Sequence, residues 1–192
     1  MTTLQAIRRR DRWADWAVIV LVAAALILGW TLREAILFRT APFNVAEAGI
    51  SGRCPAGWIR ETGEDPLLAL RNPLIDPFNA RLELRARPLA PDVDPLQALD
   101  DLSFDRASQV TAYSVLNTDQ VLVGDETVPL RTYTYVHVNR NPFADHMPIV
   151  VKGMDVALPD EGRVIIATIL AGVDDFDAHQ RYFRAFAESL EF

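Results

Sequence analysis

Three residues of the sequence are of types that bind metal ions: His137, Asp145 and His146. Imidazole and carboxylate groups are common zinc ligands. Asp145 and His146 fall in the polar stretch 139–148, and the three side chains converge only if this stretch folds back on His137. A solvated loop beside a strand histidine explains the same residues, and no spacing fixes the turn. We therefore predict no metal site and no cofactor, and keep these three residues as the metal candidates.

A second group of chemically capable side chains alternates along 127–138, a stretch typical of a long strand. Side chains of a strand alternate between its two faces, so one face carries the stripe Arg131, Tyr133, Tyr135 and His137. Aromatic, Arg and His side chains together could form an interaction face for a ligand or partner. The alternative is that a packed helix covers this stripe and leaves only its polar tips in water.

Carboxylates gather around Asp92–Asp94, Asp100–Asp101 and Asp174–Asp175. A calcium site needs several oxygens that converge on one point, whereas Asp is also favoured at the start of helices, which explains most of these acids. Motifs of the common hydrolases, phosphate-binding loops and EF-hands do not occur in the sequence. The single cysteine, Cys54, excludes an internal disulfide. We expect no catalytic residues and no enzymatic activity, although an extracytoplasmic hydrolase is a third alternative.

The elements that carry these residues predict an α+β domain, with a mainly antiparallel sheet flanked by two helices. After a lead-in at 41–57, short strands are expected at 58–61 and 67–70, and 80–87 alternates as a strand with one wet face. Asp94-Pro95 begins a helix, and five further strands follow, with 164–170 apolar on both faces. The last helix begins near Asp175 and places Phe176, Phe183, Phe186 and Leu190 on one face.

An uncharged stretch precedes this domain, from Trp16 to Leu32. Its seventeen residues span about 25 Å as a helix, which is near the thickness of a bilayer core. Trp16 and Trp30 stand near its ends, where indole rings favour the headgroup region. We predict one transmembrane helix with its extension at 13–38. A cleaved signal peptide is the alternative, but no small-x-small cleavage pattern follows Leu32.

Charge sets the expected orientation. Residues 1–39 carry six arginines against three acids, a net charge of +3. Because the whole chain has a net charge of −7, residues 40–192 carry a net charge of −10. The arginines before the apolar stretch are Arg8, Arg9, Arg10 and Arg12. Basic residues favour the cytoplasmic side, so we expect a single-pass protein of the cell (inner) membrane. Its parts are a cytoplasmic segment 1–12, the membrane helix 13–38 and an extracytoplasmic domain 39–192.

Two stretches of the domain resemble a known family. Cys54-Pro55-Ala56-Gly57-Trp58 resembles the Pro-x-Gly-Trp string before the first strand in the PsbP/DcrB/LpqN-like superfamily, a Mog/PsbP-type α/β sandwich. Phe183–Phe192 resembles its closing helix, and the order of elements from Ala41 to Phe192 is similar too. The chain departs from the common pattern by Cys54, where an aromatic or aliphatic residue is frequent, and by its membrane helix.

The resemblance implies a non-enzymatic module at the outer face of a membrane, with no catalytic set to carry over. With the anchor, it predicts an accessory or assembly subunit of a membrane protein complex. The alternative is a small-molecule or lipid-binding protein at the outer membrane face. We expect a membrane protein complex as partner and lipid contact through the N-terminal helix. The acidic domain repels nucleic acid, so no nucleic-acid partner is expected.

Overall fold

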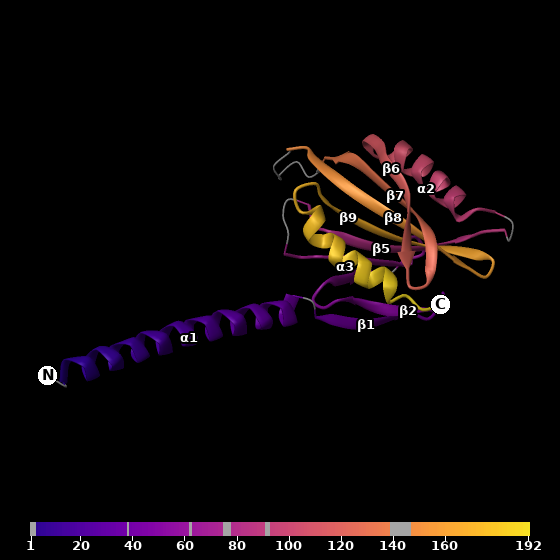
Figure 1. Ribbon diagram of the computed structural model, residues 1–192. Coiled ribbons are helices and arrows are strands. Elements are labelled where there is room, and N and C mark those ends of the chain that lie inside the picture. The colour runs from indigo at the N-terminus through magenta and orange to yellow at the C-terminus, as the bar shows by residue number, and fades with distance from the viewer. Residues whose placement is uncertain (1–2, 38, 62, 75–77, 91–92, 139–146) are drawn as a thin grey trace. The chain divides into compact units, whose positions relative to one another are not determined.

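A computed structural model describes residues 3–37, 39–61, 63–74, 78–90, 93–138 and 147–192 (Figure 1). For residues 3–15, 34, 36 and 37 only the backbone is described. The chain divides into two compact units, Met1–Arg39 and Thr40–Phe192, and each is described here by itself.

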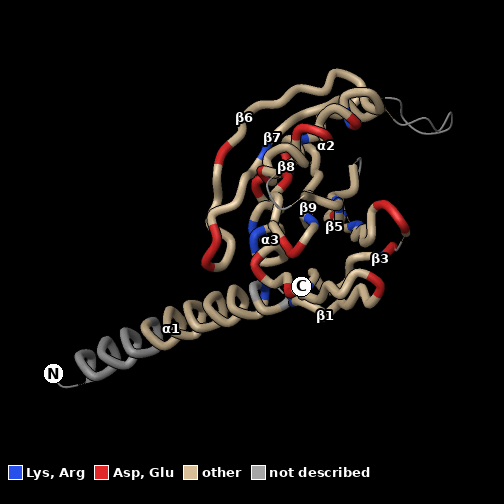
Figure 2. The backbone as a smooth tube through the Cα atoms, turned by 90° about the vertical axis from the view of Figure 1, so that its right-hand side faces the viewer, with Lys and Arg blue, Asp and Glu red and all other residues tan. Residues whose placement is uncertain are grey.

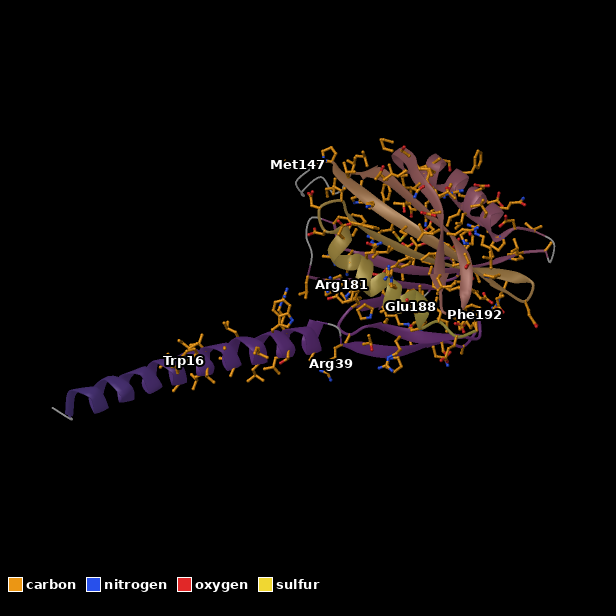
Figure 3. All side chains as sticks on the ribbon, in the orientation of Figure 1. Trp16, Arg39, Met147, Arg181, Glu188 and Phe192 are labelled. Atoms are coloured by element: carbon orange, nitrogen blue, oxygen red, sulfur yellow. The ribbon has the colours of Figure 1, made fainter. Side chains whose placement is uncertain are left out.

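The first unit is one helix, α1 (Thr3–Leu37). Its stretch Trp16–Arg33 has a mean hydropathy of 2.0, and all of its side chains are exposed. Figure 3 shows these side chains projecting along α1 from Trp16 onward. Eighteen helical residues measure about 27 Å, so this stretch is long and apolar enough to cross a membrane. The basic residues Arg8, Arg9, Arg10 and Arg12 have side chains outside the described part of the chain.

The second unit is built on a seven-stranded antiparallel sheet with the order β3-β4-β5-β9-β8-β7-β6. A two-stranded hairpin and two helices complete it. In chain order the elements are β1 (Thr40–Val45), β2 (Ile50–Pro55), β3 (Ile59–Glu61), β4 (Leu68–Arg71), β5 (Arg81–Pro88), α2 (Pro95–Gln109), β6 (Thr111–Val123), β7 (Glu126–His137), β8 (Ile149–Asp160), β9 (Arg163–Gly172) and α3 (Phe176–Glu188). The predicted fold class, an antiparallel α+β domain with two helices after an apolar helix, is confirmed.

The two helices cover opposite faces of the sheet (Figure 1). On β9, Ile165 and Ile169 join the larger core with Phe176, Phe183 and Phe186 of α3. The intervening Ile166 packs instead with Leu99 and Leu102 of α2. Alternation along a strand sends neighbouring side chains to opposite faces. The central position of β9, between β5 and β8, therefore explains why its sequence is apolar on both faces, apart from the buried Thr168.

The hairpin β1–β2 corrects the expectation of an irregular lead-in at 41–57. Its strands pair from Thr40–Pro55 to Val45–Ile50. Phe43 lies opposite Gly52, and its ring stacks on Phe186 of α3 with 5.6 Å between centroids. The C-terminus closes onto the same hairpin, because Ser51 and Glu191 exchange two backbone hydrogen bonds of 2.8 and 2.9 Å. Glycine and proline often mark loops in a sequence, but here Pro42, Gly52 and Pro55 lie within a paired ribbon.

Two further expectations differ from the structure. Strands predicted at 112–116 and 120–123 form one strand, β6, with irregular register between Thr111 and Ser114 and between Val115 and Asn117. Four strands therefore follow α2, where five were expected. The supposed wet face of β5 is also partly closed, because Glu83 is buried and pairs with Arg85 at 2.6 Å. Ion pairing under α2 permits this burial, and alternation in the sequence does not reveal it.

Candidate interaction site

The predicted interaction stripe on β7 begins under α2. Arg131 is only 6% exposed. Its guanidinium donates to the Asp100 carboxylate at 2.7 Å and to the Ser103 hydroxyl at 3.0 Å, both on α2, and to the Thr118 hydroxyl of β6 at 3.3 Å. The next member of the stripe, Tyr133, is fully buried. This half of the stripe is the covered underside of a helix, which corrects the hypothesis of an exposed contact face.

Tyr133 lies beside a second buried group, Asp155 of β8, to whose carboxylate its hydroxyl donates at 3.5 Å. The Arg106 guanidinium of α2 lies over the Tyr133 ring at 4.7 Å from its centroid and pairs with the Asp155 carboxylate. The Thr168 hydroxyl of β9 donates to the same carboxylate at 2.7 Å. Burial, and then the charge of Asp155, raise the pKa of Tyr133 well above its ordinary value, so its hydroxyl stays protonated at neutral pH.

The Arg106–Asp155 pair fastens α2 to the middle of the sheet. Asp155 is fully buried, and the Arg106 side chain is 12% exposed. Burial lowers the pKa of Arg106 and is the largest single effect, but the charge and hydrogen bond of Asp155, together with Tyr133 and Glu83, outweigh it, and the net pKa lies above the ordinary value. A buried charge is stable only when it is paired and hydrogen-bonded. This polar core of Arg106, Tyr133, Asp155 and Thr168 therefore serves to position α2. The sequence analysis missed it, although the lone Asp in the otherwise largely apolar stretch 149–158 could have pointed to it.

The second half of the stripe, Tyr135 and His137, is half-buried. Burial, followed by the Glu83 carboxylate, raises the pKa of Tyr135 to about 12. His137 packs its ring against Phe78 at 5.2 Å in an edge-on geometry, and burial and Arg81 lower its pKa. The other metal candidates, Asp145 and His146, lie outside the described residues. Among the residues that are described, no group of three His, Cys, Asp or Glu side chains could hold a metal ion.

Two members of the acidic clusters, Asp94 and Asp100, are occupied by a helix cap and by an ion pair, and Asp92 lies outside the described residues. The Asp94 carboxylate accepts a hydrogen bond of 2.9 Å from the Leu96 amide and caps α2, with Pro95 in the first turn, as predicted. Asp100 pairs with Arg131. Asp175 stands at the N-cap of α3 but makes no side-chain capping bond. These geometries favour the helix-cap interpretation over a calcium site.

Among the described strands, the edge strand β6 has no neighbouring strand on one side and is largely exposed. β6 is the last strand of the order, and ten of its thirteen residues are exposed. Beside it lies a groove of about 490 Å³, lined mainly by polar and proline residues of β6, β7 and the start of α2. A smaller apolar groove between β6–β8 and α3 measures about 40 Å³. Lipid and drug-like ligands need several hundred Å³, so this apolar groove cannot enclose one.

Solved structures resemble the domain in fold. The solution structure of cyanobacterial PsbP (CyanoP) from Synechocystis sp. PCC 6803 matches with a TM-score of 0.55 and 13% identity, over 80% of this chain and 92% of that one. The crystal structure of the Ran-binding protein Mog1p from Saccharomyces cerevisiae matches with a TM-score of 0.51 and 13% identity, over 80% and 95%. LpqN of Mycobacterium tuberculosis, involved in cell envelope biogenesis, gives 0.49 and 13%, over 79% and 83%.

The domain has the Mog1p/PsbP-like fold. The CyanoP and Mog1p matches carry this conclusion and confirm the predicted resemblance at the level of the fold. The sequence itself matches no family model and no curated protein. In this Mog1p/PsbP-like domain the Pro-Ala-Gly-Trp string ends β2 and precedes β3, and the C-terminal stretch closes as α3 followed by the Ser51–Glu191 bridge.

Proposed function

We propose that this chain is a non-enzymatic, membrane-anchored binding module that serves as an accessory or assembly subunit of a membrane protein complex. The observation that carries the proposal is α1: its apolar stretch of 18 residues is fully exposed, and α1 ends three residues before the first strand of a separately packed domain. An apolar surface of this length is costly in water and stable in a bilayer.

The topology is part of the proposal. The arginines before Trp16 favour a cytoplasmic N-terminus, with the Mog1p/PsbP-like domain on the extracytoplasmic side. A tether of this kind holds the domain at the surface and raises its effective concentration toward membrane partners, so a modest interface suffices. The ion pairs Arg106–Asp155 and Arg131–Asp100 hold α2 on the sheet, so these charged side chains have a structural role. This supports a binding module over an enzyme. Mog1p, of the same fold, is a Ran-binding protein.

The anchor is tested by fractionation and protease protection of the tagged full chain. We expect it to stay in membranes after alkaline carbonate washing, with its N-terminal residues intact. Protease added outside spheroplasts should degrade the domain but leave an N-terminal tag protected. A mature chain that begins after Leu32 and is water-soluble would contradict the anchor, and a domain protected from external protease would contradict the orientation.

The binding role is tested by mild-detergent purification of the native complex. We expect one membrane protein partner at a fixed ratio to this chain, measured by native mass spectrometry. The matched control replaces α1 with a cleavable signal peptide, which releases the domain and should reduce recovery of the partner. Only monomeric chain from wild-type membranes, at several detergent concentrations, would count against an accessory-subunit role.

A ligand-binding role is the second candidate, and the 490 Å³ groove beside β6 favours it because its volume suits a small molecule. Its lining is polar and includes the carboxylates of Asp94 and Asp119. Native mass spectrometry of the purified chain tests this role, since a bound molecule adds its mass. A mass equal to that of the polypeptide alone in every preparation would exclude a tightly held ligand.

A further inference from the structure

We propose that β6 accepts an extended segment of a partner protein as an eighth strand of the sheet, and that this segment carries Lys or Arg side chains. The inference deepens the proposed function and rests on it, because it names the surface and the chemistry of the partner. A strand added to an open edge gains affinity from main-chain hydrogen bonds and specificity from alternate side chains.

The two edges of the sheet differ in length and in protection. At one edge, β3 has three residues, too few to template another strand. At the other edge, β6 has thirteen. Proteins usually shorten, charge or bulge an exposed edge strand. β6 bulges only in its first half, where Ala112 also has a positive φ of 54°, and runs in unbroken register with β7 from Asn117 to Val123.

The register shows which backbone groups of this regular stretch point outward. Val123 and Glu126 close a two-residue turn, so they form a hydrogen-bonded pair, and such pairs recur at every second position. Gln120 is a non-hydrogen-bonded position, and it lies opposite Pro129, which has no N–H to donate. By the same alternation, Thr118, Gln120 and Leu122 present their backbone N–H and C=O groups to the open side.

The Asp119 carboxylate supports this assignment independently. It accepts a hydrogen bond of 2.9 Å from the backbone N–H of Gln120, so this N–H is not used in the ladder to β7. The carboxylate occupies the place that a carbonyl of an added strand would take. A partner carbonyl can replace it, and Asp119 is then free to face a cation on the partner.

The charge around this edge indicates a basic occupant. The twenty residues from Thr111 to Leu130 contain Asp119, Asp125 and Glu126 but no Lys or Arg. Figure 2 shows acidic positions on β6 and at its turn, without basic ones along the strand. The groove beside the strand adds Asp94. Two cations lie near the strand: Arg131 is buried and already paired with Asp100, and Arg184 of α3 lines the small groove at the Val123 end together with Glu188.

Apolar side chains complete the surface. Val115, Leu116 and Leu122 are exposed on β6, with Leu122 at 63%. A partner strand with apolar residues between its basic ones would cover them and gain from their burial. A second copy of this chain fits less well, because edge-to-edge pairing would bring together two strands that share the same acidic residues and have no basic ones.

The test uses the full chain in nonionic micelles and a fluorescent nine-residue peptide that alternates valine or threonine with arginine. Two matched peptides replace arginine by glutamate or carry N-methyl groups on the amides of one edge. Gln120→Pro removes one outward N–H, and Gln120→Thr keeps it. Proline is tolerated on the open side of an edge strand. We expect the Gln120→Pro variant to keep its melting temperature to within a few degrees.

By fluorescence anisotropy we expect the arginine peptide to bind the wild type and Gln120→Thr alike. Binding should weaken at least about tenfold with Gln120→Pro, with the glutamate peptide and with the N-methylated peptide. Isotope-edited infrared spectra should place the bound peptide in a strand. Equal binding of the arginine and glutamate peptides, or of Gln120→Pro and Gln120→Thr, or no peptide binding at all, would overturn the proposal. If Gln120→Pro does not fold, the comparison of the arginine, glutamate and N-methylated peptides on the wild type decides.

Two outcomes separate this inference from the proposed function. If Gln120→Pro and wild-type chains co-purify with the same membrane partner at the same ratio, the accessory role holds and the β6 edge is not its interface. If the wild type recovers no partner but binds the arginine peptide through Gln120, the edge assignment holds and the accessory role fails. A wild-type dimer in sedimentation analysis that Gln120→Pro dissociates would assign the edge to a second copy and refute the basic segment.

Discussion

The ring of Tyr133 fills the space directly above Gly153, its partner across β7 and β8. A Cβ on Gly153 would collide with the Tyr133 ring and would lie only 2.6 Å from its hydroxyl oxygen, closer than any real contact. On its other side the ring meets the Arg106 guanidinium at 4.7 Å and the Tyr113 ring at 5.2 Å. Tyr133 is thus held between the backbone of the sheet and α2, and glycine at 153 is what lets the ring lie so close.

The first prediction concerns this contact. Gly153→Ala should lower the free energy of unfolding by about 1–3 kcal/mol, because Tyr133 must leave its position and disturb Arg106. Denaturant titration of the full chain in micelles measures the change. Gly172→Ala is the matched control, since its Cβ would meet only Asp175, at 3.9 Å, and should change stability by less than about 0.5 kcal/mol. Equal effects of the two variants would contradict the steric account.

The second prediction concerns the buried ion pair. Arg106→Leu should destabilise the domain by about 3–5 kcal/mol, because it leaves the Asp155 carboxylate buried without a counter-charge. The double variant Arg106→Leu/Asp155→Leu should recover most of this loss. Arg71→Leu is the control, since it removes an exposed 3.9 Å pair with Glu61 that contributes about 1 kcal/mol at most. A double variant no more stable than the single one would refute the interpretation.

The third prediction is a pH dependence from His137. Its pKa in the folded domain lies below the ordinary 6.5. As pH falls through about 6.5, the unfolded chain therefore takes up a proton before the folded one does, and stability falls. Above that pH the contribution is fully present. His137→Asn should flatten this part of the melting-temperature profile between about pH 5 and 8. An unchanged slope in the variant would show that other groups cause it.

The fourth prediction concerns the start of α2. Asp94→Ala should cost about 1 kcal/mol of stability, because the Leu96 amide loses its capping acceptor. Asp94→Asn keeps an acceptor oxygen and should cost much less. Thermal unfolding by circular dichroism gives both values. If alanine and asparagine behaved alike, the capping bond would contribute nothing measurable.

Local patterns of residues were sufficient to predict much of the fold. Asp94-Pro95 marked the start of α2, and the helical spacing of Phe176, Phe183 and Phe186 marked the buried face of α3. These signals are local, because capping and helical periodicity involve residues a few positions apart. The hairpin β1–β2 was missed, since its apolar side chains are few and gain their partners from α3.

The candidate site was less predictable. The stripe on β7 was identified correctly as one face of a strand, but only the packing of α2 buries Arg131 and Tyr133. Arg106 and Asp155 are 49 residues apart, and no local pattern connects them. The open edge was also hidden, because hydrophobic alternation says which face of a strand is buried and nothing about its neighbours in the sheet.

By itself, the sequence determined the apolar helix, the acidic domain after it and the α+β class, because hydropathy, charge and periodicity are properties of neighbouring residues. Only the tertiary structure decided which polar residues meet in the core under α2 and which strand lies open at the edge. Those depend on strand order and helix packing, which bring distant residues within a few ångströms of one another and which no local stretch of sequence encodes.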